Sequence, residues 1–322
     1  MKSQPLVSIV TPSLNQGPFI DQTIRSVLDQ DYPRIEYIVV DGGSTDGTLA
    51  ILEKYKNRLT YTSEPDAGQS DAVNKGWRRA KGEILAYLNS DDTYCPGAVR
   101  KTVEAFQRFP DAGVVYGDCY GIDESGGIIR RLRLPDVDLP KLLCFTIIHQ
   151  PAVFIRRTVT DAVGLLDPRL EGLMDHDLWL RAAFRFRFHH IREFLACCRE
   201  HPRSKNARLG VRFGREAIAI LDRTYADPAR SDGILALKGK AYAGAYLMSA
   251  FWSCLSGERQ QSQDHLLKAL KLNPRLLWNQ LTVPLFLDGY LRIPIIPLLR
   301  GLKHRWIGQR EIVERALNRI LR

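Results

Sequence analysis

The sequence predicts an α/β fold: a Rossmann-like, doubly wound and mostly parallel sheet over residues 1–205, followed by a helical region over residues 206–322. Short apolar runs of strand length end in polar loops, and each loop precedes an amphipathic helical segment. Near residue 205 the strand-like runs cease and helical periodicity continues alone. The length of 322 residues is consistent with two such domains.

The first two predicted strands share one pattern. Residues 6–11 (LVSIVT) lead into the loop PSLNQG, and residues 35–40 (IEYIVV) lead into DGGSTDG. We expect helices over residues 19–30 and 48–55, because apolar positions recur there at helical spacing. Ser, Thr and Asp side chains before the second helix offer oxygens to its free amides.

The next strands lead to an acidic tip. A strand over residues 59–62 precedes the helix-opening segment EPDAGQSDAVNKG, and residues 84–88 (ILAYL) stop at residues 89–92 (NSDD). Five apolar residues at strand length indicate a buried parallel strand. Ligands of open α/β sheets bind at the carboxyl ends of such strands, so we expect Asp91 and Asp92 where a divalent cation and a phosphate are held.

Later segments complete the sheet and then become helical. Strands are expected over residues 113–116 and 152–155, with an irregular excursion near the site between them over residues 123–140. A helix is expected to follow the segment MDHD. The C-terminal helices are predicted over residues 211–225, 234–255 and 260–272. The last two resemble a single tetratricopeptide-like hairpin, although a plain helical cap is the favoured interpretation.

Composition narrows the class of protein. The net charge of +10 lies in the C-terminal third, since residues 1–200 hold 25 Lys and Arg against 27 Asp and Glu, and residues 201–322 hold 21 against 9. Six cysteines without a CxxC pair favour a reducing compartment. The N-terminus enters a strand without an apolar signal region, and no run of about 18 apolar residues predicts a spanning helix. A cytoplasmic location is therefore expected.

Seven segments in this order resemble family 2 glycosyltransferases: SIVTPSLNQG, VVDGGSTDGT, SEPDAGQSDAVNKG, LNSDD, IIHQPAVFIRR, MDHDLWLR and CREHPRS. The resemblance covers roughly residues 6–205. It implies a GT-A fold and transfer of a sugar, with inversion, from a UDP-, dTDP- or GDP-linked donor. It also implies Mg²⁺ or Mn²⁺ as the cofactor.

The resemblance assigns the nucleotide side of the site. Thr11 and Pro12 would form a close backbone wall for the nucleotide, and Asp41 would contact the nucleobase. A capping role for Asp41 is the alternative, but the neighbouring Ser and Thr residues already compete for that role. Asp71 and Lys75 would hold the donor, and for Lys75 a solvated charge remains the alternative.

The same resemblance gives the cation loop its ligands. Asp91 and Asp92 would bind the metal ion, and His201 would approach the metal or the diphosphate. Asn89 stands where the commonest family form has Asp, so Asn89, together with Ser90, is left to contact either the metal or the donor sugar. A simple polar turn over residues 89–92 is the alternative.

The acceptor side follows from three further segments. Asp175 matches the family's catalytic base, which takes the proton of the attacking hydroxyl, while Met174 replaces the first acid of the usual pair. His149 and Gln150 match positions near the sugar and the acceptor. Arg199 would be available to phosphate.

The C-terminal region suggests a surface interaction. Residues 281–302 are apolar but interrupted by charges and prolines, and residues 311–322 form a basic amphipathic pattern. Such a pattern fits an anionic membrane surface on the inner face of the cell membrane, or docking onto its own domain. No basic motif interleaved with aromatic residues favours nucleic acid.

These observations predict a glycosyltransferase that acts on a glycan or lipid-linked acceptor in bacterial surface polysaccharide biosynthesis. One alternative is a non-catalytic nucleotide-sugar-binding scaffold with a helical recruitment module. A second is a sugar-1-phosphate nucleotidyltransferase, which is disfavoured because the loop after the first strand lacks Lys and Arg.

Overall fold

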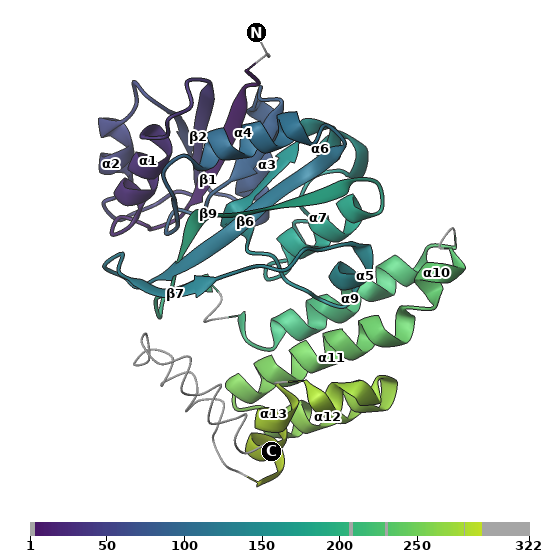
Figure 1. The fold of residues 1–322 in the computed structure, drawn as a ribbon. Coiled ribbons are helices and arrows are strands. Elements are labelled where there is room, and N and C mark those ends of the chain that lie inside the picture. The colour runs from purple at the N-terminus through teal and green to yellow at the C-terminus, as the bar shows by residue number, and fades with distance from the viewer. Residues whose placement is uncertain (1–3, 206–208, 229–230, 280, 292–322) are drawn as a thin grey trace. The chain divides into compact units, whose positions relative to one another are not determined.

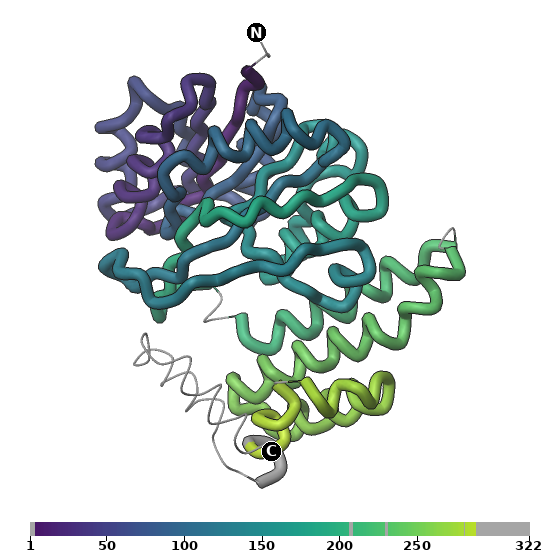
Figure 2. Tube along the Cα trace, in the orientation of Figure 1, coloured from purple at the N-terminus to yellow at the C-terminus, as the bar shows by residue number. Residues whose placement is uncertain are grey.

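The computed structural model describes residues 4–205, 209–228, 231–279 and 281–291. Contacts divide the chain after Lys205 into two compact units (Figure 1; Figure 2). The first unit contains a sheet with helices packed on it, and the second is helical.

In the described part of the first unit, nine strands form one sheet in the order β3-β2-β1-β4-β8-β6-β9-β5, with β7 beside β6. The strands are β1 Val7–Ser13, β2 Ile35–Asp41, β3 Thr60–Ser63, β4 Ile84–Tyr87, β5 Thr93–Tyr94, β6 Ala112–Ile122, β7 Ile128–Leu132, β8 Val153–Arg156 and β9 Arg187–Arg199. The helices are α1 Ile20–Leu28, α2 Thr48–Lys54, α3 Gln69–Arg79, α4 Ala98–Arg108, α5 Leu139–Leu143, α6 Arg157–Val163 and α7 Met174–Ala183.

The register of the parallel strands creates the edge that carries the site. Strand β1 pairs in parallel with β2 and β4, and β2 pairs in parallel with β3. Ser13 lies opposite Asp41, which lies opposite Ser63. Parallel strands joined by helices therefore end at one edge, and the predicted doubly wound α/β architecture is confirmed.

Helix α3 approaches the sheet unusually closely. It packs on β1 and β2, and a Cβ atom on Gly76 would lie 2.4 Å from Cγ1 of Val10. Only glycine allows this approach, because any side chain at position 76 would displace Val10 or the helix. The contact brings the first turn of α3 to the carboxyl edge.

Two parts of the sheet differ from the prediction. Residues 123–140 are not wholly irregular, because β7 forms a hairpin with β6 around a turn in which Asp123 accepts from the amides of Ser125 and Gly127. Strand β9 was not predicted at all. It pairs in parallel with β6 and antiparallel with β5, and its pairing depends on partners distant in sequence.

The second unit consists of α9 Arg212–Ala226, α10 Asp232–Leu235, α11 Lys238–Leu255, α12 Arg259–Leu272, the 3-10 helix η2 Pro274–Trp278 and α13 Thr282–Leu291. Helix α11 packs against α9 and α12, and the core around its C-terminal half includes Leu247, Leu266 and Leu285. Within the described residues, no helix is both long and apolar enough to span a bilayer. The predicted basic helix over residues 311–322 lies outside the described residues.

Candidate active site

Asp41 organises the loop at the end of β2. Its fully buried carboxylate accepts hydrogen bonds from the amides of Gly43 (3.1 Å) and Ser44 (2.8 Å). It also accepts from the hydroxyls of Ser44 (2.5 Å) and Ser63 (2.7 Å). These bonds fix the loop in place, so Asp41 determines the shape of the edge at which a nucleobase would lie.

The loop after β1 is fastened to the loop after β2. The Asn15 amide donates to Ser44 Oγ at 2.7 Å, and Asn15 Oδ1 accepts from the Thr45 amide at 2.9 Å. Thr11 and Pro12 are buried within β1, and Thr11 Oγ1 lies 3.0 Å from the Tyr37 hydroxyl. The two loops therefore form one connected surface beside Asp41.

The two acids of the tip have different surroundings. Asp92 is buried, with Oδ1 accepting from the Arg199 amide at 2.8 Å and Oδ2 from Asn89 Nδ2 at 3.2 Å. Burial, and then the nearby Asp91 charge, raise the pKa of Asp92 well above its ordinary value. The Asp91 side chain is 19% exposed, and its Oδ2 lies 3.0 Å from His201 Nε2. Asp91 is thus the carboxylate that faces solvent.

Asn89 is the centre of a hydrogen-bond network. Its Oδ1 accepts from Gln69 Nε2 at 2.6 Å, while its Nδ2 donates to Asp92 and, at 3.4 Å, to Gln150 Oε1. Gln150 in turn donates to the Tyr87 carbonyl at 2.6 Å. An aspartate at position 89 would lack both donated bonds and would place a further negative charge beside Asp92. The amide therefore suits this position.

Arg199 holds the acidic loop from beneath. Its guanidinium donates to the Asp91 carbonyl (2.8 Å), to the carbonyls of Asp123 and Glu124 (2.9 Å each) and to Gln22 Oε1 (2.7 Å). The residue is 5% exposed. The expected phosphate contact therefore gives way to a supporting role, because protein oxygens already accept from this guanidinium.

His201 is buried beside Asp91 and the ring of Phe19, whose centroid is 4.8 Å from its own. Its Nδ1 is buried and has no hydrogen-bond partner. An unsatisfied buried nitrogen is costly in a folded protein and is a reason to expect a ligand. Ser90 is also buried, and its carbonyl accepts from Thr23 Oγ1 at 2.9 Å.

Asp175 lies in the first turn of α7, where its Oδ1 accepts from the His176 amide at 2.7 Å. Burial raises the pKa of Tyr87, and the charges of Asp175 and Asp92 raise it further. Both carboxylates therefore act on one buried phenol. Met174, at the start of the same helix, accepts a contact from Ser70 Oγ at 2.8 Å, which joins α7 to the first turn of α3.

Helix α7 is held on its other sides by buried polar contacts. His176 Nε2 lies 3.0 Å from the Leu142 carbonyl, and burial lowers the pKa of His176 to about 4. Asp177 accepts from Arg181 at 2.9 Å, and Arg181 also donates to the Leu165 carbonyl at 2.8 Å. These contacts fix the direction of α7 and hence the position of Asp175.

The predicted donor residues on α3 are paired with each other. Lys75 Nζ lies 3.3 Å from Asp71 and 3.2 Å from Glu64, and Asp71 accepts from the Ala67 amide at 3.1 Å. That amide is the main cause of the lowered pKa of Asp71. Both side chains are partly exposed and shape the loop before α3.

His149 and Gln150 lie on the far side of Asn89. Burial, and then the charge of Arg130, lower the pKa of His149 to about 4, so the ring is neutral at pH 7. Gln69 was not predicted as a site residue, although it joins Asn89 to Lys205, whose Nζ donates to Gln69 Oε1 at 2.6 Å. Its position at the first residue of α3, beside Asp71, was the available signal.

Known proteins share this sequence and fold. A sequence model described as Glycosyl transferase family 2 matches residues 8–162. TuaG of Bacillus subtilis, named as a teichuronic acid biosynthesis glycosyltransferase, is 42% identical over 183 residues, which cover 55% of this chain and 71% of TuaG. The chain belongs to glycosyltransferase family 2. An uncharacterized glycosyltransferase of Rickettsia felis is 31% identical over 188 residues, and the match spans only 31% of that relative.

Solved structures show that this family 2 chain has the GT-A fold. Residues 1–349 of S. aureus TarS in complex with UDP-GlcNAc align with a TM-score of 0.64 and 18% identity, covering 94% of this chain and 90% of that one. The mannosyltransferase PcManGT of Pyrobaculum calidifontis, in complex with GDP-Man and Mn²⁺, aligns with a TM-score of 0.60 and 18% identity. That alignment covers 96% of this chain and 89% of PcManGT.

The family 2 site has limited means of holding a metal ion. Among the residues described, no three His, Cys, Asp or Glu side chains are grouped so as to bind one. The expected set of Asp91, Asp92 and His201 does not form three ready ligands, because His201 contacts Asp91 and the Asp92 oxygens accept protein hydrogen bonds. Mg²⁺ commonly uses one or two carboxylates together with substrate phosphates, and the partly exposed Asp91 fits that requirement.

Proposed function

We propose that this chain transfers a sugar, with inversion, from a nucleoside diphosphate sugar to a hydroxyl of a glycan or lipid-linked acceptor. One observation carries the proposal: Asp175 and Asp92, from α7 and the acidic tip, act on the same buried Tyr87. A base and a diphosphate-binding loop would then share one site. The complexes of TarS with UDP-GlcNAc and of PcManGT with GDP-Man support a nucleotide-sugar donor.

Asp175 is assigned the role of general base. It takes the proton of the acceptor hydroxyl as that oxygen attacks the anomeric carbon, and the nucleoside diphosphate departs from the opposite face. The intrahelical bond to the His176 amide orients the carboxylate. A single displacement of this kind inverts the configuration of the anomeric carbon.

The acidic tip is assigned to the diphosphate. Asp91 would hold Mg²⁺ or Mn²⁺ directly, with His201 beside it, and the cation would neutralise charge that develops on the leaving group. Asp92 positions this loop through the Arg199 amide and Asn89. The loops that carry Thr11, Pro12 and Asp41 would enclose the nucleoside, and Asn89 with Gln69 would face the donor sugar.

The test is release of nucleoside diphosphate from UDP-, dTDP- and GDP-sugars in the presence of acceptor. Replacing a general base typically costs about 10²–10⁴-fold in rate, so we expect a loss of that size in Asp175→Asn. The matched control is Asp161→Asn, an exposed carboxylate on α6 that should leave the rate unchanged. Full activity in Asp175→Asn would remove the base assignment, and pyrophosphate as product would indicate a nucleotidyltransferase instead.

A second proposal concerns the helical unit, which we infer contacts an anionic membrane surface on the cytoplasmic side. Large apolar side chains of η2 and the start of α13 are exposed, with Leu277 at 54%, Trp278 at 90% and Val283 at 56%. Aromatic and aliphatic side chains flanked by basic residues are typical of interfacial segments. The acceptor in bacterial surface polysaccharide synthesis would then be met at the membrane.

A further inference from the structure

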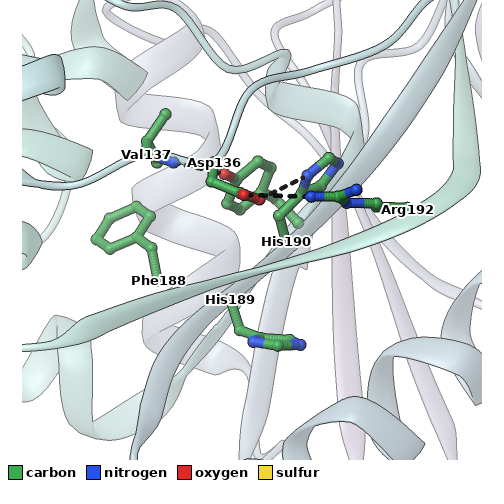
Figure 3. A pocket seen from close by; sticks show the side chains of 7 residues that line it. Asp136, Val137, Phe188, His189, His190 and Arg192 are labelled. Carbon is green, nitrogen blue, oxygen red and sulfur yellow. Dashed lines mark hydrogen bonds and ion pairs between the residues drawn. The ribbon is translucent and has the colours of Figure 1, made fainter.

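A second cavity of about 330 Å³ lies on the sheet of the first unit, between β6, β9 and the segment before α5 (Figure 3). Its walls include Tyr116, Asp136, Phe188, His190 and Arg192. His190 and Arg199 are nine residues apart on β9. At about 3.3 Å per residue this separation is about 30 Å of strand, so the cavity is distinct from the candidate active site.

The cavity contains a buried cation. The His190 side chain is 4% exposed, with Nε2 at 2.9 Å from Asp118 Oδ1 and Nδ1 at 3.2 Å from Asp136 Oδ1. Carboxylates accept hydrogen bonds, so satisfying both contacts requires a proton on each ring nitrogen and hence the imidazolium form. The ring stacks on Tyr116 with centroids 4.8 Å apart and an interplanar angle of 9°.

The surroundings hold this cation in place. The Tyr116 hydroxyl donates to the Pro135 carbonyl at 2.7 Å and accepts from the Val137 amide at 2.9 Å. Asp118 is buried and accepts from the Leu134 amide at 2.9 Å as well as from His190. The segment over residues 134–137 is therefore fastened to the sheet by its backbone, while His190 points into the cavity.

Asp136, by contrast, is weakly held. Its side chain is 65% exposed, and its second contact, to Arg192 Nη2, is 3.4 Å long. The hydrogen bond from His190 is the main cause of the lowered pKa of Asp136. Exposed ion pairs contribute little to stability, so an incoming anion could displace this carboxylate at small cost.

We propose that the cavity binds an acidic sugar whose carboxylate or phosphate replaces the Asp136 carboxylate on His190 and Arg192. Asp136 then acts as a tethered competitor for the anion. Phe188 lines the same cavity and offers an aromatic surface to the sugar ring (Figure 3). The buried imidazolium and the exposed guanidinium supply two donors to one anionic group.

The source of the sugar rests on the proposed glycosyltransferase function. It would be an acidic unit of the acceptor glycan, remote from the reacting hydroxyl. The segment that carries Asp136 continues into α5, whose Leu142 carbonyl contacts His176 of α7. The cavity and Asp175 are thus connected by a short, well-packed part of the chain.

The experiment measures binding of saccharides to the full chain by calorimetry, which requires no turnover. Glucuronate and glucose 6-phosphate represent the two anionic groups, glucose is the neutral control, and inorganic phosphate tests the anion without a ring. We expect at least one acidic sugar to bind about tenfold more tightly than glucose and inorganic phosphate. Whichever acidic sugar binds identifies the group as carboxylate or phosphate.

Two variants locate the site. Arg192→Gln should weaken binding about tenfold through loss of a charge-assisted bond, whereas Asp136→Asn should strengthen it severalfold by removing the competitor. Arg192 is 78% exposed, so its replacement should not disturb folding. The matched control is Arg203→Gln, an exposed arginine near Phe19 in the candidate active site, which should have no effect.

Several results would overturn the proposal. These are no binding of either acidic sugar to the wild type and Asp136→Asn, weaker binding in Asp136→Asn, or sensitivity to Arg203→Gln rather than Arg192→Gln. Equal binding of inorganic phosphate would remove the assignment to a sugar. If transfer activity is absent while Arg192-dependent binding persists, the proposed function fails and the pocket stands. The converse result rejects the pocket alone.

Discussion

The acidic tip illustrates how one amide can set the properties of two carboxylates. Asn89 donates to Asp92 and Gln150 and accepts from Gln69, so each polar atom of its side chain has a partner. Asp92 has a raised pKa because it is buried and lies beside Asp91. A donor at position 89 reduces the electrostatic cost of ionising Asp92, and a carboxylate there would increase it.

The variant Asn89→Asp should therefore destabilise the protein by about 1–3 kcal/mol, through unpaired acceptors and like-charge repulsion. The effect should depend on pH. An acid with a raised folded pKa stabilises the fold below its unfolded pKa, and this contribution is lost as pH rises through the folded pKa. The deficit of the variant should thus be small near pH 4 and grow toward pH 8.

Urea unfolding with EDTA present measures this deficit, and adding Mn²⁺ should reduce it if Asp91 and its neighbours bind the cation. Asn57→Asp is the matched control, because Asn57 is exposed on the surface of the same unit. An equal deficit at pH 4 and pH 8 would argue against electrostatic coupling between position 89 and Asp92.

At the scale of elements, prediction depended on how local the signal was. Strands β1, β2 and β4 are buried apolar runs, and their polar loops follow from turn chemistry, so sequence alone located them and the carboxyl edge. Strand β9 mixes charged and apolar residues and is fixed by pairing with β6, which lies far away in the chain. The supporting role of Arg199 was equally out of reach, since it depends on which carbonyls surround the guanidinium.

The contact between α3 and β1 offers a test of element packing. Adding a methyl group at Gly76 would place it 2.4 Å from Cγ1 of Val10, so Gly76→Ala should cost about 1–3 kcal/mol of unfolding free energy. Truncating the partner in the double variant Gly76→Ala, Val10→Ala should recover part of this loss relative to the sum of the single variants. Gly47→Ala is the control, because no atom lies within 4 Å of its added Cβ. Additive costs measured by urea unfolding would show that the two positions are not coupled.

At the scale of the whole molecule, the two units differ in charge as well as in fold. Residues 1–205 hold 27 Lys and Arg and 27 Asp and Glu, whereas residues 206–322 hold 19 and 9, so the entire net charge of +10 belongs to the helical unit. The near-neutral unit carries the acidic tip and Asp175. Attraction to an anionic surface would therefore come from the helical unit and leave the acidic tip unaffected.

Vesicle flotation tests that division of roles. The full chain should float with vesicles that contain phosphatidylglycerol and not with pure phosphatidylcholine, and added salt should weaken the binding because it screens exposed charges. Trp278→Ser should reduce the bound fraction severalfold, since loss of a 90% exposed indole removes apolar surface that would enter the interface. Leu235→Ser, a change at a 44% exposed position on α10, is the control for a general loss of surface hydrophobicity. Equal flotation of wild type and Trp278→Ser would exclude the η2 segment as the contact, and flotation of a fragment of residues 1–205 would place the membrane contact in the first unit instead.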